Sequence, residues 1–236
     1  MKTIIHRAAD RGLTEINWLH SRHSFSFGGY YDASRIHFGM LRVLNDDIVD
    51  PGMGFDTHPH QDMEIVTIPL SGILQHTDST GSFSLIHPGE VQVMTAGKGI
   101  LHSEYNHSLT ENVSFLQIWI FPDKKGLTPR YDQHLFAPEL LQNQFYTIIS
   151  PTCDSGCLAL HQEAYFSLGN FNEEKEITYQ LHNSNHGIYI FVIEGTVNCG
   201  EVSLTKRDAM GISDVNEITI KIEEDTRILL IEVPIS

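Results

Sequence analysis

The chain has 236 residues, of which 41% are hydrophobic and 19% are charged, and its formal net charge is −15. This composition is typical of a globular protein, and no apolar stretch approaches the ~20 residues that span a bilayer, so no membrane contact is expected. Acidic residues outnumber basic ones by 30 to 15, which would repel a phosphate backbone and argues against direct nucleic-acid binding.

The order of elements along the chain predicts an all-β protein. The first residues, MKTIIHRAADRGL, carry charges where a secretory signal would be apolar, so we expect a cytoplasmic protein. Helical turns are expected only within residues 8–20 and 137–144. Elsewhere, short segments rich in Ile, Val and Phe alternate with Gly, Pro, Asn or Asp, which is typical of a sandwich or barrel. The clearest of these segments are residues 113–122, 187–195, 218–224 and 227–235.

A weak internal repeat divides the chain. Residues 64–95 contain a strand, a Gly, a second strand, a polar turn and a third strand, and residues 187–213 show the same order. The segment 121–140 between the two copies carries prolines and turn formers without clear periodicity. We therefore predict two β-modules, residues 1–134 and residues 135–236.

Two smaller features carry expectations of their own. The three cysteines, Cys153, Cys157 and Cys199, are too few and of the wrong parity for a disulfide framework, so we expect small buried thiols. Pro69 interrupts an apolar run. Because proline has no N–H for a central ladder, we expect Pro69 at a strand edge or a bulge.

Two histidines one residue apart, His58 and His60, stand directly before an apolar run. Side chains at i and i+2 on a strand project to the same face, so both imidazoles can reach one point. Farther along the chain, His102 and Glu104 repeat this spacing. On facing strands, the two pairs would present three imidazoles and one carboxylate to one ion, a set that suits Fe, Mn, Co, Ni, Cu or Zn. Four protein ligands would leave coordination positions open for chemistry.

The spacing around these pairs resembles the two motifs of the cupin superfamily. PGMGFDTHPHQDMEIVTIPLSG has the first motif's order of Gly, H-x-H, Glu and closing Gly, and HPGEVQVMTAGKGILHSEYN resembles the second. The strings MTAGKGILHSEYN, IWIFPDKKGLTPRYDQ and WLHSRHSFSFGGYYD are similar to the pirin family of bicupins, above all to its bacterial members described as quercetin 2,3-dioxygenases. This resemblance covers at least residues 10–135.

The resemblance implies two β-barrels packed face to face, with the metal held only in the first. His58, His60, His102 and Glu104 then become its ligands, commonly of Fe(II) in this family, with Mn, Co, Ni, Cu or Zn as alternatives. Glu64 does not join them. We expect it to orient an imidazole, to act as an acid–base group beside the substrate, or to form a plain ion pair. The matching stretch of the second module has no H-x-H, so that barrel is expected to be metal-free.

The remaining histidines and aromatic residues are given ordinary roles. His20 and His23 could approach the cavity mouth but are expected to be structural, and His161 is expected at the interface between the modules. Phe25, Phe27 and Phe55 are expected to line the barrel or lie in the core. Four histidines are expected in loops or on the surface, namely His76, His87, His107 and His134.

The function implied by the resemblance is ring cleavage of a flavonol or related phenolic by O2. The substrate's deprotonated hydroxyl would bind the metal, with Glu104 or Glu64 as the proton acceptor. An alternative from another class is an iron-dependent redox switch like eukaryotic pirins, which bind transcription factors; the acidic surface permits a basic protein partner. A third alternative is another cupin reaction, such as isomerisation or oxidation of a different small phenolic.

Overall fold

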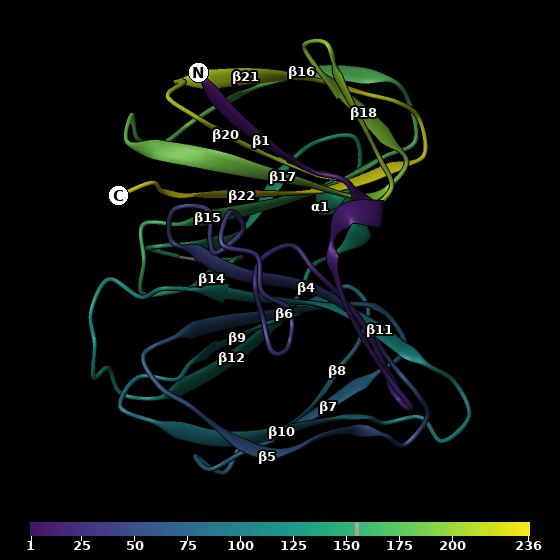
Figure 1. Cartoon of the computed structure of the whole chain (residues 1–236), viewed down its shortest axis with the longest axis vertical. Helices are drawn as coiled ribbons and strands as arrows, with labels where there is room; N and C mark the ends of the chain where they lie inside the picture. Colours follow the sequence, from purple (N-terminus) through teal and green to yellow (C-terminus); the bar gives the residue numbers. More distant parts are fainter. Residues whose placement is uncertain (154–155) are drawn as a thin grey trace.

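The computed structural model describes residues 1–153 and 156–236 and shows two stacked β-modules (Figure 1). Each module combines a seven-stranded sheet with a four-stranded sheet. The helical elements of the described residues are a 3-10 turn, Ala8–Asp10, and the short helix α1, Pro138–Leu141. Both lie in the segments where the sequence predicted helical turns. The all-β class is confirmed.

The first module forms the lower half of Figure 1. Its larger sheet has the order β12-β9-β6-β11-β4-β3-β2. The strands of this sheet are β2 (Gly12–Ile16), β3 (Leu19–His23), β4 (Leu41–Val49), β6 (Glu64–Ser71), β9 (Glu90–Thr95), β11 (Val113–Ile120) and β12 (Arg130–Leu135). The smaller sheet, in the order β5-β10-β7-β8, consists of β5 (Gly54–His60), β7 (Leu74–Asp78), β8 (Phe83–Ile86) and β10 (Ile100–Asn106).

The second module repeats this plan. Its larger sheet has the order β1-β20-β17-β22-β15-β13-β14. These strands are β1 (Lys2–His6), β13 (Tyr146–Ser150), β14 (Leu158–Ala159), β15 (Tyr165–Phe171), β17 (His186–Glu194), β20 (Ala209–Ser213) and β22 (Thr226–Pro234). The smaller sheet, in the order β16-β21-β18-β19, consists of β16 (Lys175–Gln180), β18 (Thr196–Cys199), β19 (Val202–Thr205) and β21 (Glu217–Ile222).

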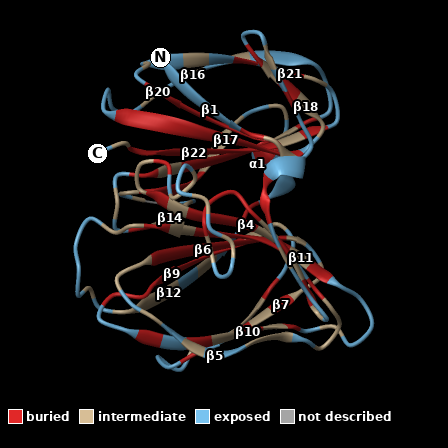
Figure 2. Cartoon of the chain, viewed as in Figure 1, coloured by how far each residue is buried: buried red, intermediate tan, exposed pale blue. Residues whose placement is uncertain are grey.

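The two larger sheets pack against each other and form the main hydrophobic core. Side chains such as Val66 and Ile118 from the first module share one buried cluster with Phe166, Tyr189 and Leu229 from the second. The buried strands accordingly run through the middle of the molecule in Figure 2. Burial of such apolar area is the dominant favourable term in folding. The smaller sheets therefore lie at the two outer ends, and the predicted face-to-face packing of the modules is confirmed.

The first strand of the chain belongs to the larger sheet of the second module. β1 pairs antiparallel with β20, with Lys2 opposite Ser213 and His6 opposite Ala209. The chain then crosses into the first module, where β2 begins at Gly12. The division at residue 134 stays a proposal, and β1 crosses it.

Pro69 lies at an irregularity in the ladder between β6 and β11. It pairs with Phe115, and the register shifts between Ser114 and Phe115. On the other side of β6, the pairing with β9 ends at Thr67. On the β9 side, no ladder hydrogen bond requires the N–H that Pro69 lacks. The register shift against β11 confirms the expected bulge.

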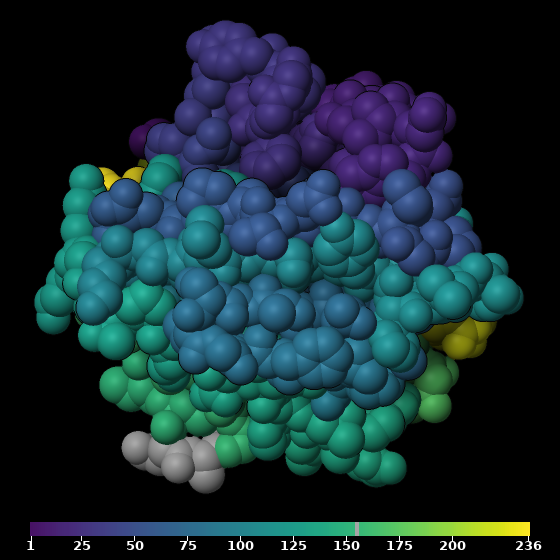
Figure 3. Space-filling view, turned by 90° about the horizontal axis from the view of Figure 1, so that it is seen from below, coloured from purple at the N-terminus to yellow at the C-terminus, as the bar shows by residue number. Residues whose placement is uncertain are grey.

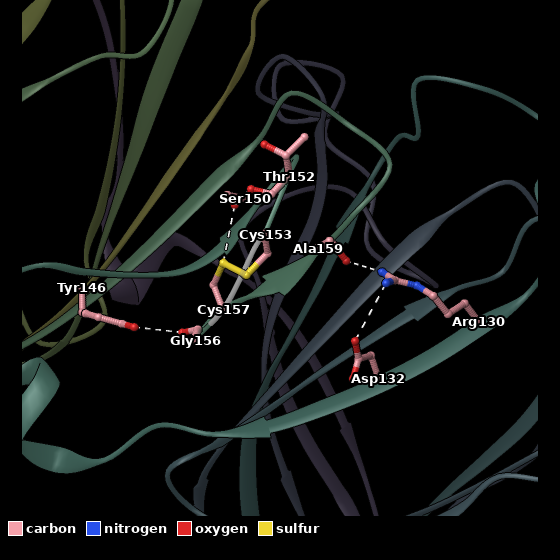
Figure 4. The surroundings of a disulfide bond; sticks show 9 residues. All are labelled: Arg130, Asp132, Tyr146, Ser150, Thr152, Cys153, Gly156, Cys157 and Ala159. Atoms are coloured by element: carbon pink, nitrogen blue, oxygen red, sulfur yellow. Dashed lines mark hydrogen bonds and ion pairs between the residues drawn. A yellow bond between two sulfur atoms is a disulfide. The ribbon is translucent and has the colours of Figure 1, made fainter.

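The cysteines differ from the expectation. Cys153 and Cys157 form a disulfide, and Cys199 is a buried free thiol. Figure 4 shows the hydrogen bonds near this disulfide, including the one from the Tyr146 hydroxyl to the Gly156 carbonyl, 2.9 Å long. The prediction of buried thiols is correct for Cys199 and wrong for the other two. The Cα atoms of Cys153 and Cys157 lie 5.7 Å apart, which is within disulfide range.

Candidate metal centre

The smaller sheet of the first module brings the four predicted ligands onto neighbouring strands. β5 and β10 pair antiparallel, with His58 directly opposite His102 and His60 opposite Ile100. Residues directly opposite each other share a face of the sheet. The imidazoles of His58, His60 and His102 consequently meet on one face. Figure 3 views the molecule from below, onto the end formed by this sheet, with the purple N-terminal segments along one edge.

The three imidazoles converge closely. The Nε2 atoms of His58 and His102 are 3.0 Å apart, and the ring centroid of His60 lies 4.8 Å and 4.7 Å from those of His58 and His102. Neighbouring ligand atoms lie about 3 Å apart around a transition metal with bonds of about 2.1 Å. The Nδ1 of His58 donates to the carbonyl of Asp56 at 2.7 Å, which leaves Nε2 as the lone-pair nitrogen. This tautomer is the one that a metal ligand needs.

Glu104 reaches the same cavity through an irregularity in the ladder. The register of β10 against β5 shifts between His102 and Glu104. A Cβ on Gly54 would lie 2.2 Å from the Glu104 carbonyl oxygen, so only glycine permits this approach of the strands. Oε2 of Glu104 accepts a hydrogen bond from Gln117 at 2.8 Å, and Gln117 accepts one from Thr67 at 3.1 Å. Oε1 is buried without a partner among the described residues, as expected of an atom that binds a cation.

The candidate ligand atoms fall into two overlapping groups. His58, His60 and His102 form one group and His76, His102 and Glu104 the other, with all atoms of a group within 4.8 Å of one another. His76 was expected in a loop or on the surface. That prediction is wrong, because His76 lies in β7, is fully buried, and stands opposite Glu104 on the neighbouring strand. Its Nε2 lies 3.1 Å from an oxygen of Asp78.

Burial sets the protonation of these groups in the protein alone. It lowers the pKa of His60 to about 4, with a further contribution from His58. Burial and the neighbouring imidazoles lower the pKa of His102 to about 2. Burial also raises the pKa of Glu104 to about 7, against the hydrogen bonds from Gln117 and Thr67. Neutral imidazoles are the form that binds metals, and a cation would compensate the buried carboxylate.

A cavity beside these side chains has one aromatic wall and one polar wall. Phe27, Phe55 and Trp119 form the aromatic wall. Asn45 and Asp47 lie on the polar wall with Gln117, and the sequence reasoning missed all three. Burial raises the pKa of Asp47 to about 7, against a hydrogen bond from Ser21. Asn45 and Asp47 alternate on the same face of β4 as the apolar Val43 and Val49, and polar residues on that face were a usable signal for this wall.

Glu64 does not lie in this cavity. It shares its face of β6 with Val66, which belongs to the core between the modules, whereas Ile65 on the opposite face packs with Trp119. Oε2 of Glu64 accepts a hydrogen bond from Thr95 at 3.0 Å. The expected role of Glu64 beside the substrate or an imidazole is therefore corrected: the carboxyl points toward the other module.

The remaining assignments are settled by burial and contacts. His23 is buried and lies 2.8 Å from both Asn45 and Thr14, so it supports the polar wall from behind. His20 lies 3.7 Å from Glu15 at the surface. The carbonyl of His161 accepts a hydrogen bond from Asp123, at the interface as expected. Phe25 lies in the core. Three histidines are exposed as predicted, namely His87, His107 and His134.

The two sandwiches and the His/Glu cluster define a bicupin with side chains suited to a divalent metal. Residues 6–120 match the family model described as Pirin, and residues 147–233 match the model described as Quercetinase C-terminal cupin domain. None of the helices in the described part of the chain is long and apolar enough to cross a membrane.

Full-length relatives agree with these matches. A quercetin 2,3-dioxygenase of Escherichia coli K12 is 38% identical over 230 residues, which cover 98% of both chains. The crystal structure of the bacterial pirin YhhW of Escherichia coli in complex with nickel(II) covers 100% of both chains, with 37% identity and a TM-score of 0.94. The protein YhaK of Escherichia coli covers 92% of this chain and 93% of its own, with 25% identity and a TM-score of 0.76. The chain belongs to the pirin family.

Proposed function

We propose that this protein is a metal-dependent dioxygenase that opens a ring of a flavonol or related phenolic. The observation that carries the proposal is that His58, His60 and His102 converge in one group, which shares His102 with a second group containing Glu104, beside a cavity lined by aromatic and polar residues. The quercetin 2,3-dioxygenase relative, aligned over nearly the whole chain, supports the reaction type.

The donor set fits a divalent transition metal. His58 offers Nε2, and Glu104 has a buried oxygen without a partner among the described residues. Imidazole and carboxylate donors suit Fe(II), which we propose as the native ion, as well as Mn, Co, Ni, Cu or Zn. When bound, the ion would supply Lewis-acid stabilisation of an oxygen anion on the substrate.

The chain's own residues would position the substrate and move its proton. Phe27 and Trp119 line the cavity, and their rings pack edge to face at 5.3 Å. Their apolar surfaces would cover the substrate ring and exclude water. Gln117 fixes one oxygen of Glu104 and leaves the other toward the site. When that second oxygen is not bound to the ion, it can accept the proton of a substrate hydroxyl within hydrogen-bond reach.

Oxygen uptake with quercetin tests this function. Iron-loaded protein is expected to consume O2 with quercetin and to release carbon monoxide. His60→Ala should abolish both uptake and stoichiometric metal content, whereas His134→Ala, at an exposed histidine on β12, should change neither. Full activity and full metal content in His60→Ala would reject the assignment.

A further inference from the structure

We propose that a cluster of arginines between the two modules binds a tetrahedral oxyanion, either free phosphate or the phosphate group of a small metabolite. Three arginines, Arg11, Arg207 and Arg227, form this cluster together with one acid, Asp46. We call these four residues the arginine cluster. Their side chains come from both modules, and the site is independent of the function proposed above.

Asp46 and Arg227 reach the interface between the modules from opposite sides. Asp46 shares its face of β4 with Leu44, and Arg227 shares its face of β22 with Leu229. Leu44 and Leu229 both belong to the core between the modules. The arginine cluster therefore lies at this interface, and the opposite face of β4 lines the cavity beside the metal centre.

Two of the arginines share the single carboxylate of Asp46. Nη1 of Arg11 and Nε of Arg207 each lie 3.5 Å from Oδ2 of Asp46. Arg11 also donates to the carbonyl of Arg22 at 2.9 Å, and its guanidinium carbon lies 5.1 Å from the ring centre of Phe191. Charge-assisted hydrogen bonds are usually about 2.7 to 2.9 Å long, so Asp46 satisfies neither arginine fully.

Several nitrogen atoms of the arginine cluster have no partner. The Arg227 side chain makes no hydrogen bond and no ion pair within the described part of the chain, and its Nε is buried. Nε of Arg11 and Nη1 of Arg207 are likewise buried without a partner among those residues. The Arg11 side chain is only 1% exposed. Buried donors in native proteins are nearly always satisfied by the protein, by water or by an ion.

The arginine cluster carries an excess of positive charge. Guanidinium groups stay protonated in proteins, so three of them against the one carboxylate of Asp46 leave a net charge of +2. Burial and the charge of Arg207 lower the pKa of Arg227, and no acidic group among the described residues raises it. A buried charge without a partner is costly. A bound dianion would remove this cost.

Phosphate is the dianion that fits these donors best. Each guanidinium is a planar fork that can donate two hydrogen bonds to phosphate or carboxylate oxygens. The oxygens of phosphate point to all sides, so they can accept from guanidiniums that approach from two modules. A carboxylate presents its two oxygens in one plane and serves fewer of them.

A cleft gives a ligand access to Arg227. Asn170 and Arg227 stand opposite each other on β15 and β22, and both line this cleft, whose volume is about 290 Å³. Glu194 and Asp225 line it as well, and Glu194 is paired with Lys206 at 2.6 Å. Neither acid raises the pKa of Arg227, so their charges do not compensate its guanidinium.

Phosphate titration of the metal-loaded, full-length protein tests the inference. The titration is done in chloride buffer at constant ionic strength and about pH 8, where phosphate is mostly a dianion. Calorimetry should show saturable binding, and Tm should rise by about 3 to 6 °C at about ten times the dissociation constant. Arg227→Met should bind phosphate at least ten-fold more weakly and lose this rise. Lys221→Gln, which removes an exposed positive charge on β21, is the matched control and should bind phosphate as wild type does.

Two further ligands identify the source of the phosphate group. Glycerol 3-phosphate carries the same group on a short carbon chain. If it binds more tightly than inorganic phosphate, the site takes a phosphorylated metabolite, and if it binds more weakly, the site takes the free ion; both results support the proposal. Malonate is a dianion without a tetrahedral centre and should bind at least ten-fold more weakly than phosphate. Tighter binding of malonate than of phosphate would refute the ligand class.

Two other results would overturn the inference. One is the absence of saturable phosphate binding by wild-type protein. The other is equal phosphate affinity in wild type and Arg227→Met, because the anion would then bind elsewhere, such as at the metal. If Arg227→Met does not fold, Arg207→Met, at a side chain that is 22% exposed, should show the same loss of binding, and unchanged affinity there would also overturn the inference.

Discussion

Replacing Glu64 by glutamine should change how the stability of the protein depends on pH. Glu64 is fully buried, and this burial raises the pKa of its carboxyl from 4.5 to about 7. A hydrogen bond from Thr95, the peptide group of His161 and the charge of Arg130 act in the opposite direction, while Asp123 adds to the rise. The folded protein therefore holds the proton more strongly than the unfolded chain does. This stabilising contribution is complete below pH 4.5 and is lost as the pH rises through about 7.

The size of the effect follows from the two pKa values. A difference between 4.5 and about 7 corresponds to about 3 kcal/mol, at about 1.4 kcal/mol per pH unit. Glutamine has nearly the shape of the protonated acid and carries no charge at any pH. Glu64→Gln should thus match the wild type near pH 4.5 and exceed its free energy of unfolding by about 3 kcal/mol at pH 8.5.

Urea unfolding at several pH values between 4.5 and 8.5 measures this difference. Comparing variant with wild type at each pH cancels the contributions of the other buried acids, including Asp47. Glu201→Gln, in the exposed turn between β18 and β19, is the matched control and should follow the wild-type curve. If Glu64→Gln tracks the wild type across the range, or falls below it at pH 8.5, the buried carboxyl does not titrate as the structure indicates.

Three further predictions concern the site and the chain around it. Gln117→Leu removes the hydrogen bond to Glu104 and should weaken metal binding about 10- to 100-fold in a chelator competition, with the fold intact by circular dichroism; unchanged affinity would contradict it. Gly54→Ala places a Cβ 2.2 Å from the Glu104 carbonyl oxygen and should lower both metal affinity and Tm, whereas a wild-type Tm would show that the strands can separate freely. Replacing Cys153 and Cys157 by serine opens a five-residue loop and should cost about 2 kcal/mol in denaturant unfolding; the same loss should appear when wild type is reduced, and no loss in either case would count against the disulfide's contribution.

Much of the fold could be read from the chain because the relevant signals are local. Alternating Ile, Val and Phe between turn residues predicted the strands, and the repeat predicted two modules. The destination of β1 could not be read in this way, because its pairing with β20 depends on a contact more than 200 residues distant, such as Lys2 with Ser213. The disulfide was missed for a related reason, since spacing alone does not say whether a turn brings Cys153 and Cys157 together.

The predicted site shows the same limit at the scale of single residues. The spacing of two placed His58 with His60, and His102 with Glu104, because side chains alternate along a strand. The same rule applied to β7 would have placed His76 inward with Leu74, since both are buried on that strand. The direction of the Glu64 side chain was harder to predict, because β6 is buried on both faces from its first residue through Pro69. A strand without alternation carries no information about which side a given residue faces.

Because β1 pairs with a strand of the second module, folding cannot be completed before the end of synthesis. Lys2–His6 leave the ribosome early, yet their partner strand, Ala209–Ser213, emerges near the end of translation. The neighbouring strand that they need in the seven-stranded sheet does not exist until then, so β1 stays unpaired during most of translation. Cutting the polypeptide between its halves would leave the first fragment with an unsatisfied amino-terminal arm and the second with an open flank. A split version of the protein should consequently reassemble through that arm when both fragments are mixed.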